Sequence, residues 1–223
     1  MLKAALIMGR KDLRLIRGKG LMPSLLLGLL LIFLFSLSLQ PGEGMTPQAA
    51  AAVFWMSSAF CQTILFSALY ALEEVNGQRH GLLLAPAPVQ GIWLGKALAG
   101  VCLLLAAQIL FLPAAIVFLG QETGPSWPLG LGALLLTDAG MAGLGSLLGA
   151  LSQSSSARDT LLGILLFPLQ IPLLLAGISL GATAFRAPLP PDAASWLGLS
   201  LAFDAIFLAA GLALFPHLYS GED

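Results

Sequence analysis

The chain has 223 residues, of which 58% are hydrophobic and only 9% are charged, with a mean hydropathy of +0.93 and a formal net charge of −1. A soluble domain needs polar surface to cover its core, so this balance excludes an ordinary soluble protein and predicts that lipid surrounds most of the molecule. The composition gives no basic excess for nucleic-acid binding. Cys61 and Cys102 both lie in apolar stretches, which indicates neither a disulfide framework nor a thiolate metal site.

The first predicted element is an amphipathic helix at residues 2–17, within a cytoplasmic leader of residues 1–20. On a helical wheel the apolar residues Leu2, Leu6, Leu13 and Ile16 gather on one side, and the basic residues Lys3, Arg10, Arg14 and Arg17 on an adjoining one. Ile7 and Asp12 depart from this pattern. Such a helix can lie in the membrane interface, with its cations near anionic headgroups. The alternative is a positive-inside anchor with no further role.

Six transmembrane helices follow, because about 20 apolar residues cross about 30 Å of hydrocarbon. We predict them at about residues 21–40, 49–72, 91–119, 127–151, 160–183 and 195–216. Together they form one transmembrane domain over residues 21–216, with a short cytoplasmic tail at 217–223. With the N-terminus inside, nine of the ten Lys and Arg residues lie on the cytoplasmic side and only Arg186 lies outside. This bias predicts that both termini are cytoplasmic.

Glycine pairs at a spacing of four recur in the predicted spans. They are Gly91 and Gly95, Gly145 and Gly149, and Gly177 and Gly181. Small residues at this spacing let helix backbones approach closely in lipid, so the pairs predict a packed bundle or an oligomer.

The loop after the second span is the most polar segment beyond the leader. Residues 80–85 could form a short apolar helix on the cytoplasmic face, ended by Pro86 and Pro88, of the kind that fits the groove of a soluble partner. The candidate contacts with an ATPase partner are Glu73, Glu74, Asn76, Gly77, Arg79, His80, Gly81, Leu83, Leu84 and Pro86. The alternative is an ordinary loop with interfacial leucines.

Polar residues inside the spans are candidate functional groups, because a charge at membrane depth is costly unless it is paired or hydrated. The candidates are Asp138, Gln170 and Asp204, and the candidate helix kinks are Pro113, Pro168 and Pro172. No Lys or Arg within the spans offers the carboxylates an obvious partner. The alternative is that the carboxyl groups are neutral or serve only in hydrogen bonds between helices.

The chain carries no pattern of a catalytic or metal site. The lysines that follow glycine, Lys19 and Lys96, lack the earlier glycine of a Walker A loop. His80 and His217 are far apart and have no ligand partners at metal-binding spacing, and no C-x-x-C-H heme attachment motif occurs. We therefore expect a non-catalytic subunit that binds no metal, with any ATPase activity in a partner chain.

Several segments resemble the CcmB family, the membrane subunit of the heme exporter ABC system of cytochrome c maturation. They are Arg10 to Arg14, the span opening at Pro23, Gly81 to Pro86 before Lys96, and Arg158 to Leu162 running into Leu166 to Pro172. The resemblance covers nearly the whole chain.

The resemblance implies an all-α membrane protein of the ABC-2-like permease type in the bacterial inner membrane. It implies a CcmA-like ATPase subunit that binds ATP, a CcmC-like heme-handling membrane protein and a heme chaperone, with heme as cargo, and it allows a homodimer of permease subunits. ATP hydrolysis would then drive either heme transfer or the release of the heme-loaded chaperone. The alternatives are an ABC-2 permease for a lipid, drug or glycan, a proton-coupled carrier that uses Asp138 and Asp204, and an assembly scaffold.

Overall fold

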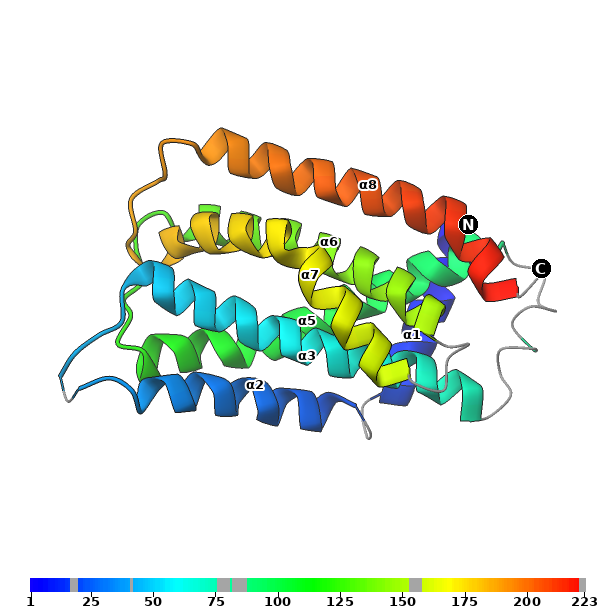
Figure 1. Ribbon diagram of the computed structural model, residues 1–223, viewed down its shortest axis with the longest axis horizontal. Helices are drawn as coiled ribbons and strands as arrows, with labels where there is room; N and C mark the ends of the chain where they lie inside the picture. Colours follow the sequence, from blue (N-terminus) through cyan, green and yellow to red (C-terminus); the bar gives the residue numbers. More distant parts are fainter. Residues whose placement is uncertain (17–19, 41, 76–80, 82–87, 153–157, 221–223) are drawn as a thin grey trace.

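The computed structural model describes the chain except for residues 17–19, 41, 76–80, 82–87, 153–157 and 221–223. The described elements are α1 (Leu2–Ile16), α2 (Leu21–Ser36), α3 (Pro47–Val75), α5 (Val89–Phe118), α6 (Trp127–Ser152), α7 (Arg158–Gly181), the 3-10 helix η1 (Ala182–Phe185) and α8 (Ala193–Ser220). Within the described ranges every regular element is helical. Figure 1 shows α2, α3, α5, α6, α7 and α8 running lengthwise as a bundle, with α1 across one end.

The predicted spans are recovered as long apolar helices. Five stretches are long and apolar enough to cross a membrane: Pro47–Ala71, Val89–Phe118, Trp127–Ser152, Leu162–Phe185 and Ala193–Leu218. The first predicted span corresponds to α2, which has 16 residues and is therefore about 24 Å long. It reaches the length of a span only together with α1, from which it diverges by 73°. By length and apolar character the described chain therefore has five candidate spans, or six if α1 and α2 together are one span, and α2 packs along α3 and α5.

Local sequence explains where the second long helix begins. Pro47 is the first residue of α3, where the missing amide hydrogen costs nothing and the fixed φ suits a helix. The hydroxyl of the preceding Thr46 accepts a hydrogen bond from the amide of Ala49 at 3.3 Å, which satisfies one of the free donors of the first turn. This cap explains why the helix begins two residues before the predicted boundary.

The predicted proline kinks lie inside continuous helices. Pro113 lies within α5, and Pro168 and Pro172 lie within α7. Figure 1 shows α7 changing direction along its length, as expected when proline removes hydrogen bonds of the helix interior. We infer no translocation path from these bends.

Two of the three predicted glycine pairs receive aromatic side chains of α3. A Cβ at Gly145 would lie 2.7 Å from the ring of Phe66, and one at Gly149 would clash with the ring of Tyr70. On α7, Cβ atoms at Gly177 and Gly181 would meet the Trp55 ring at 3.0 and 3.1 Å. Phe66, Tyr70 and Trp55 are among the largest fully buried side chains. The glycines therefore provide the recesses that let α6 and α7 pack on α3.

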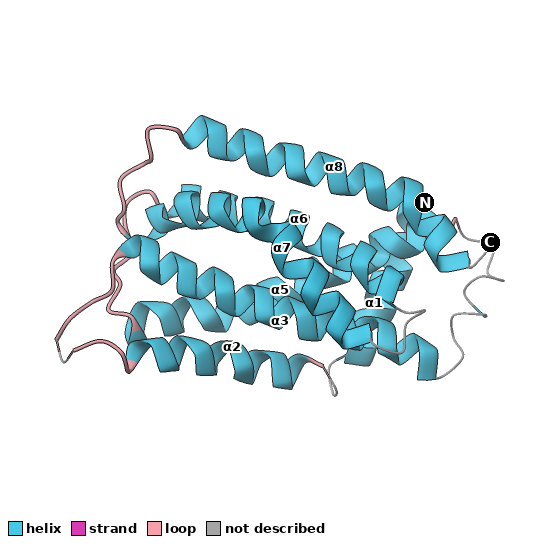
Figure 2. Cartoon of the chain, viewed as in Figure 1, coloured by secondary structure: helices cyan, strands magenta, loops and turns pink. Residues whose placement is uncertain are grey.

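The end of the bundle opposite the termini is tied together by its loops. Figure 2 shows most of the described loops, in pink, at this end. The side-chain amide of Gln121 donates a 2.7 Å hydrogen bond to the carbonyl of Met45, which joins the loop before α6 to the loop before α3. The amide of Gly124 donates to the carbonyl of Ala184 at 3.0 Å, which joins the same loop to η1.

Candidate functional site

The N-terminal helix α1 is docked on the membrane bundle along one face. That face consists of Ala5, Met8, Gly9, Asp12 and Ile16. Its main partner is α5, where a Cβ at Gly95 would lie 2.6 Å from the Met8 Cβ and 2.7 Å from the Ala5 carbonyl oxygen. Only glycine allows this approach, so the predicted pair Gly91 and Gly95 holds the N-terminal helix and not another span.

A buried ion pair lies beneath this contact. The Lys96 ammonium lies 3.4 Å from Asp12 Oδ2, and the two side chains are only 0% and 2% exposed. The partly buried Lys11 lies 3.3 Å from Asp12 Oδ1, so the carboxylate has a cation at each oxygen. Removing both charges from solvent is costly unless they are paired, and breaking such a pair leaves one charge stranded. The pair therefore fixes α1 in one position along α5.

Further contacts extend the pair into the bundle. The Lys96 ammonium lies 3.5 Å from the Leu69 carbonyl and 4.5 Å from the centre of the Tyr70 ring, both on α3. The Tyr70 hydroxyl donates to the Ser146 carbonyl of α6 at 2.6 Å, and the Ser146 hydroxyl donates to the Trp93 carbonyl of α5 at 3.3 Å. We call Asp12, Lys96, Tyr70 and Ser146 the Lys96 network. It connects α1, α3, α5 and α6 at one end of the bundle.

The structure corrects the helical-wheel interpretation of the leader. Asp12, which departed from the wheel pattern, lies on the docked face, and Ile16 is buried in the bundle. Leu2 and Leu6 are exposed together with Ile7, so the apolar residues of the wheel are divided between two surfaces. The reason is that α1 contacts a helix on one side, which a wheel drawn for a membrane surface does not include. Insertion of the exposed residues into lipid stays a prediction.

The structure describes two of the three predicted arginines of the leader. Arg10 and Arg14 are exposed, as a contact with headgroups would require, and Arg17 lies outside the described residues.

The predicted ATPase-contact segment lies between α3 and α5. The backbones of Glu73 and Glu74 belong to the last turn of α3, and Gly81 is exposed. The other residues of this set lie outside the described residues: Asn76, Gly77, Arg79, His80, Leu83, Leu84 and Pro86. The ends of α3 and α5 that flank the segment lie at the same end of the bundle as α1 (Figure 1). Of the Lys96 network, Tyr70 precedes the segment by three residues and Lys96 follows it by eight.

Asp138 belongs to a polar cluster inside the bundle. Its Oδ1 accepts a 2.8 Å hydrogen bond from the side-chain amide of Gln108 on α5, and that amide also lies 3.3 Å from the Ser58 hydroxyl on α3. Nearby along α3, the Gln62 amide donates to the Met141 carbonyl of α6 at 2.7 Å. Asp138 is fully buried, and its Oδ2 has no hydrogen-bond partner among the described residues.

Asp204 is in a different environment. It is partly buried on α8, and its carboxyl group lies against α6 where a Cβ at Gly140 would clash with it. Positions 138 and 140 of α6 are separated by a rotation of about 200° around the helix axis, so they face nearly opposite sides. Asp138 faces Gln108 of α5, whereas Asp204 lies against the opposite side of α6. The structure therefore does not bring the two carboxylates into one site.

Gln170 is fully buried on α7, and neither its amide nitrogen nor its oxygen has a hydrogen-bond partner among the described residues. It does not join the Asp138 cluster. Sequence reasoning missed Lys96, Ser58 and Gln62 as polar groups of the interior. Lys96 could have been recognised as an interior residue because it lies four residues after Ile92, inside the apolar pattern of a helix.

The two cysteines and the described histidine lie on different helices. His217 is exposed in α8, and His80 lies outside the described residues. Cys61 is buried in α3, and Cys102 is exposed in α5. Over the part of the chain that the structure describes, no three His, Cys, Asp or Glu side chains come together as metal ligands.

Comparison with known proteins gives two findings. Residues 3–216 match the CcmB family, described as CcmB protein. The chain is also similar to heme exporter protein B of Paracoccus denitrificans, with 29% identity over 183 residues. That alignment covers 79% of this chain and 80% of the relative. The family match includes α1 and every predicted span, so it covers the Lys96 network as well as the bundle.

Proposed function

The chain belongs to the CcmB family, and from this membership we propose that it is the membrane subunit of an ABC transporter that serves heme export for the assembly of c-type cytochromes. The observation that carries the proposal is the family match over residues 3–216, which includes the whole bundle and its docked N-terminal helix. Heme export is the role in the name of the Paracoccus relative. The long apolar helices agree with a permease subunit in the bacterial inner membrane.

A separate ATPase subunit supplies the energy in this proposal, because the sequence has no Walker A loop. Such a subunit binds the cytoplasmic segment at residues 73–88 and presses on it differently in its different nucleotide states. A ligand shifts a conformational equilibrium only through a difference in contact between the two states. The excess of cations in the leader supports an orientation with the termini and this segment in the cytoplasm.

The Lys96 network connects the cytoplasmic segment to the interior of the bundle, so it can transmit a movement of that segment. Lys96 is eight residues from the end of the segment, and it contacts both α1 and α3. Tyr70 is three residues before Glu73, and it is bonded to α6. Movement of the segment therefore displaces α1 and α6 together with α3 and α5. A CcmC-like membrane protein then receives the movement, so that heme is transferred or its loaded chaperone is released.

The test compares substitutions in the cytoplasmic segment with substitutions at the opposite end of the bundle, each in the full complex. Glu73→Lys with Glu74→Lys, and separately Leu83→Ser, should lower holo-cytochrome yield at least tenfold while the complex still hydrolyses ATP. Glu43→Lys with Asp192→Lys changes two exposed carboxylates of the opposite end and should leave the yield unchanged. Membrane levels of each variant are measured by immunoblot. Normal holo-cytochrome in the first pair at normal membrane levels would exclude the segment from the mechanism.

A further inference from the structure

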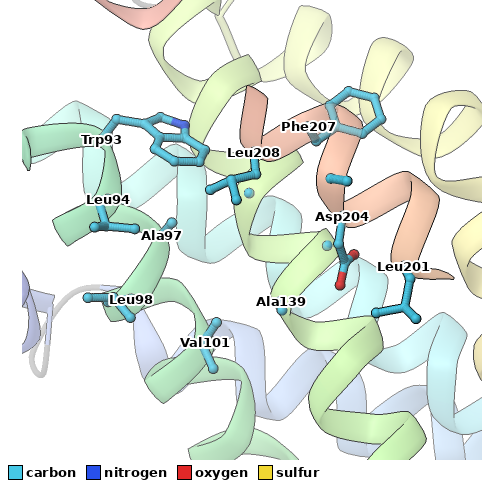
Figure 3. A pocket seen from close by; sticks show the side chains of 13 residues that line it. Trp93, Leu94, Ala97, Leu98, Val101, Ala139, Leu201, Asp204, Phe207 and Leu208 are labelled. Carbon is cyan, nitrogen blue, oxygen red and sulfur yellow. The ribbon is translucent and has the colours of Figure 1, made fainter. Parts of the chain in front are cut away.

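A cavity of about 400 Å³ lies between α5, α6 and α8. Its volume is in the range of about 300–1,000 Å³ that is usual for small-molecule sites. Figure 3 shows Trp93, Leu98 and Val101 of α5 facing Asp204 and Leu208 of α8 across the space. The remaining wall is formed by small and aliphatic residues and one phenylalanine, so nearly all of it is apolar. Asp204 is the sole ionisable side chain in this lining.

Asp204 has no counter-ion among the described residues. Its Oδ1 is buried without a hydrogen-bond partner, and none of the ion pairs found among the described residues includes it. Asp204 lies eleven residues after Ala193, the first residue of α8, which places it about 17 Å along the helix. A carboxylate at this depth in a membrane is costly unless a partner neutralises it. A cation within the cavity would supply that partner.

The opposite wall offers a second group that favours a cation. Trp93 is buried to 1% exposure, and its indole packs against α8 where a Cβ at Gly211 would clash with it. Indole is the aromatic group that attracts organic cations most strongly.

We propose that the cavity between α5, α6 and α8 binds a lipophilic organic cation, whose charge is neutralised by Asp204 and whose apolar groups fill the leucine-lined space beside Trp93. A ligand with an apolar shell suits a cavity whose lining is almost entirely apolar. Heme fits poorly, since the lining has none of the His, Cys, Met or Tyr side chains that hold heme iron. The carboxylate of Asp204 would also repel the propionates of heme.

The test uses tetraphenylphosphonium as the probe, with the purified full-length protein in lipid nanodiscs and equilibrium dialysis as the measurement. Tetraphenylborate has the same shape and the opposite charge, so it reports binding that depends on apolar contact alone. We expect saturable binding of the cation and none of the anion. Equal binding of the two ions would show an apolar cleft for lipid tails, and absence of cation binding would equally overturn the proposal.

Variants then test whether Asp204 is the carboxylate that neutralises the bound cation. Asp204→Asn should weaken cation binding about thirty-fold or more, because it removes one partner of a desolvated charge pair. Asp204→Glu should retain most of the affinity, and Trp93→Phe should weaken binding about threefold. Asp192→Asn, an exposed carboxylate outside the cavity, is the matched control. Gel filtration of each variant shows that it is folded, and unchanged affinity in folded Asp204→Asn would overturn the assignment. Because binding needs no partner subunit, this outcome is independent of the transport role proposed above.

Discussion

Lys96 of α5 and Asp12 of α1 are 84 positions apart in the sequence, and they form a 3.4 Å ion pair that is almost completely buried. The pair makes the leader an integral part of the bundle. A basic N-terminal segment that only anchored the protein would keep its charges exposed, as those of Arg10 and Arg14 are. The buried pair therefore gives α1 a defined position relative to α5.

The first prediction concerns the stability of this pair. Asp12→Leu should lower the free energy of unfolding by about 3–5 kcal/mol, because it takes the carboxylate away from the buried Lys96 ammonium. Lys96→Met should cost less, because Lys11 still lies 3.3 Å from Asp12. The double variant should be more stable than Asp12→Leu, since it removes both members of the buried pair. Chemical unfolding in detergent, followed by tryptophan fluorescence, measures the three values. Arg10→Met, at an exposed position of the same helix, is the control. Additive losses in the double variant would contradict the pairing.

The second prediction concerns the contact between α1 and α5. Gly95→Ala should push α1 away, because the new Cβ would lie 2.7 Å from the carbonyl oxygen of Ala5. A disulfide between Ala4→Cys and Gly91→Cys, in a cysteine-free background, reports the docked position, because the two Cβ positions are 3.2 Å apart and a shift of a few tenths of an ångström brings them to disulfide spacing. Its yield should fall several-fold in Gly95→Ala. Gly132→Ala, which adds a Cβ in open space, should leave it unchanged.

The third prediction separates a structural role of Asp138 from proton transport. Asp138→Asn keeps a group that can bond Gln108 and should cost less than about 1 kcal/mol, whereas Asp138→Leu removes the nearer of the two acceptors of the buried Gln108 amide and should cost about 1–3 kcal/mol. Holo-cytochrome yield should remain normal in Asp138→Asn. Loss of function in that variant, with normal stability, would favour a proton-coupled carrier instead.

The fourth prediction concerns the link between α3 and α6. Tyr70→Phe keeps the ring beneath the Lys96 ammonium but removes the hydroxyl that bonds Ser146. Unfolding free energy should fall by about 1 kcal/mol. In the proposed role, the coupling of ATP hydrolysis to cytochrome assembly should weaken more than the stability does, so the ATP consumed per holo-cytochrome formed should rise. The control Ser36→Ala, at a partly exposed position, loses only a hydroxyl bond within its own helix and should change neither quantity.

Hydropathy alone predicted the long helices to within a few residues, because a span must be apolar for about 20 residues regardless of its neighbours. The start of α3 differs by two residues because the Thr46 cap acts outside the apolar run. The Gly-xxx-Gly spacing also predicted close packing correctly, but not the partners. Nothing local to Gly95 indicates that it receives an interfacial helix and not another span.

The polar interior was less predictable. Gln108 and Asp138 are 30 positions apart, so their hydrogen bond depends on how α5 and α6 are rotated toward one another. Lys96 was assigned to the cytoplasmic loops by its charge, whereas a long aliphatic stem lets it be buried while its ammonium reaches Asp12. The cavity beside Asp204 arises from three helices together, and no single segment of sequence carries a sign of it.

The hydrogen bonds from Gln121 to Met45 and from Gly124 to Ala184 have a mechanical consequence. They hold together the loop before α3, the loop before α6 and η1, so helices at that end cannot separate without breaking several bonds at once. In the transport role proposed above, a displacement of α1 at the other end would therefore tilt the helices while the tied loops keep their positions.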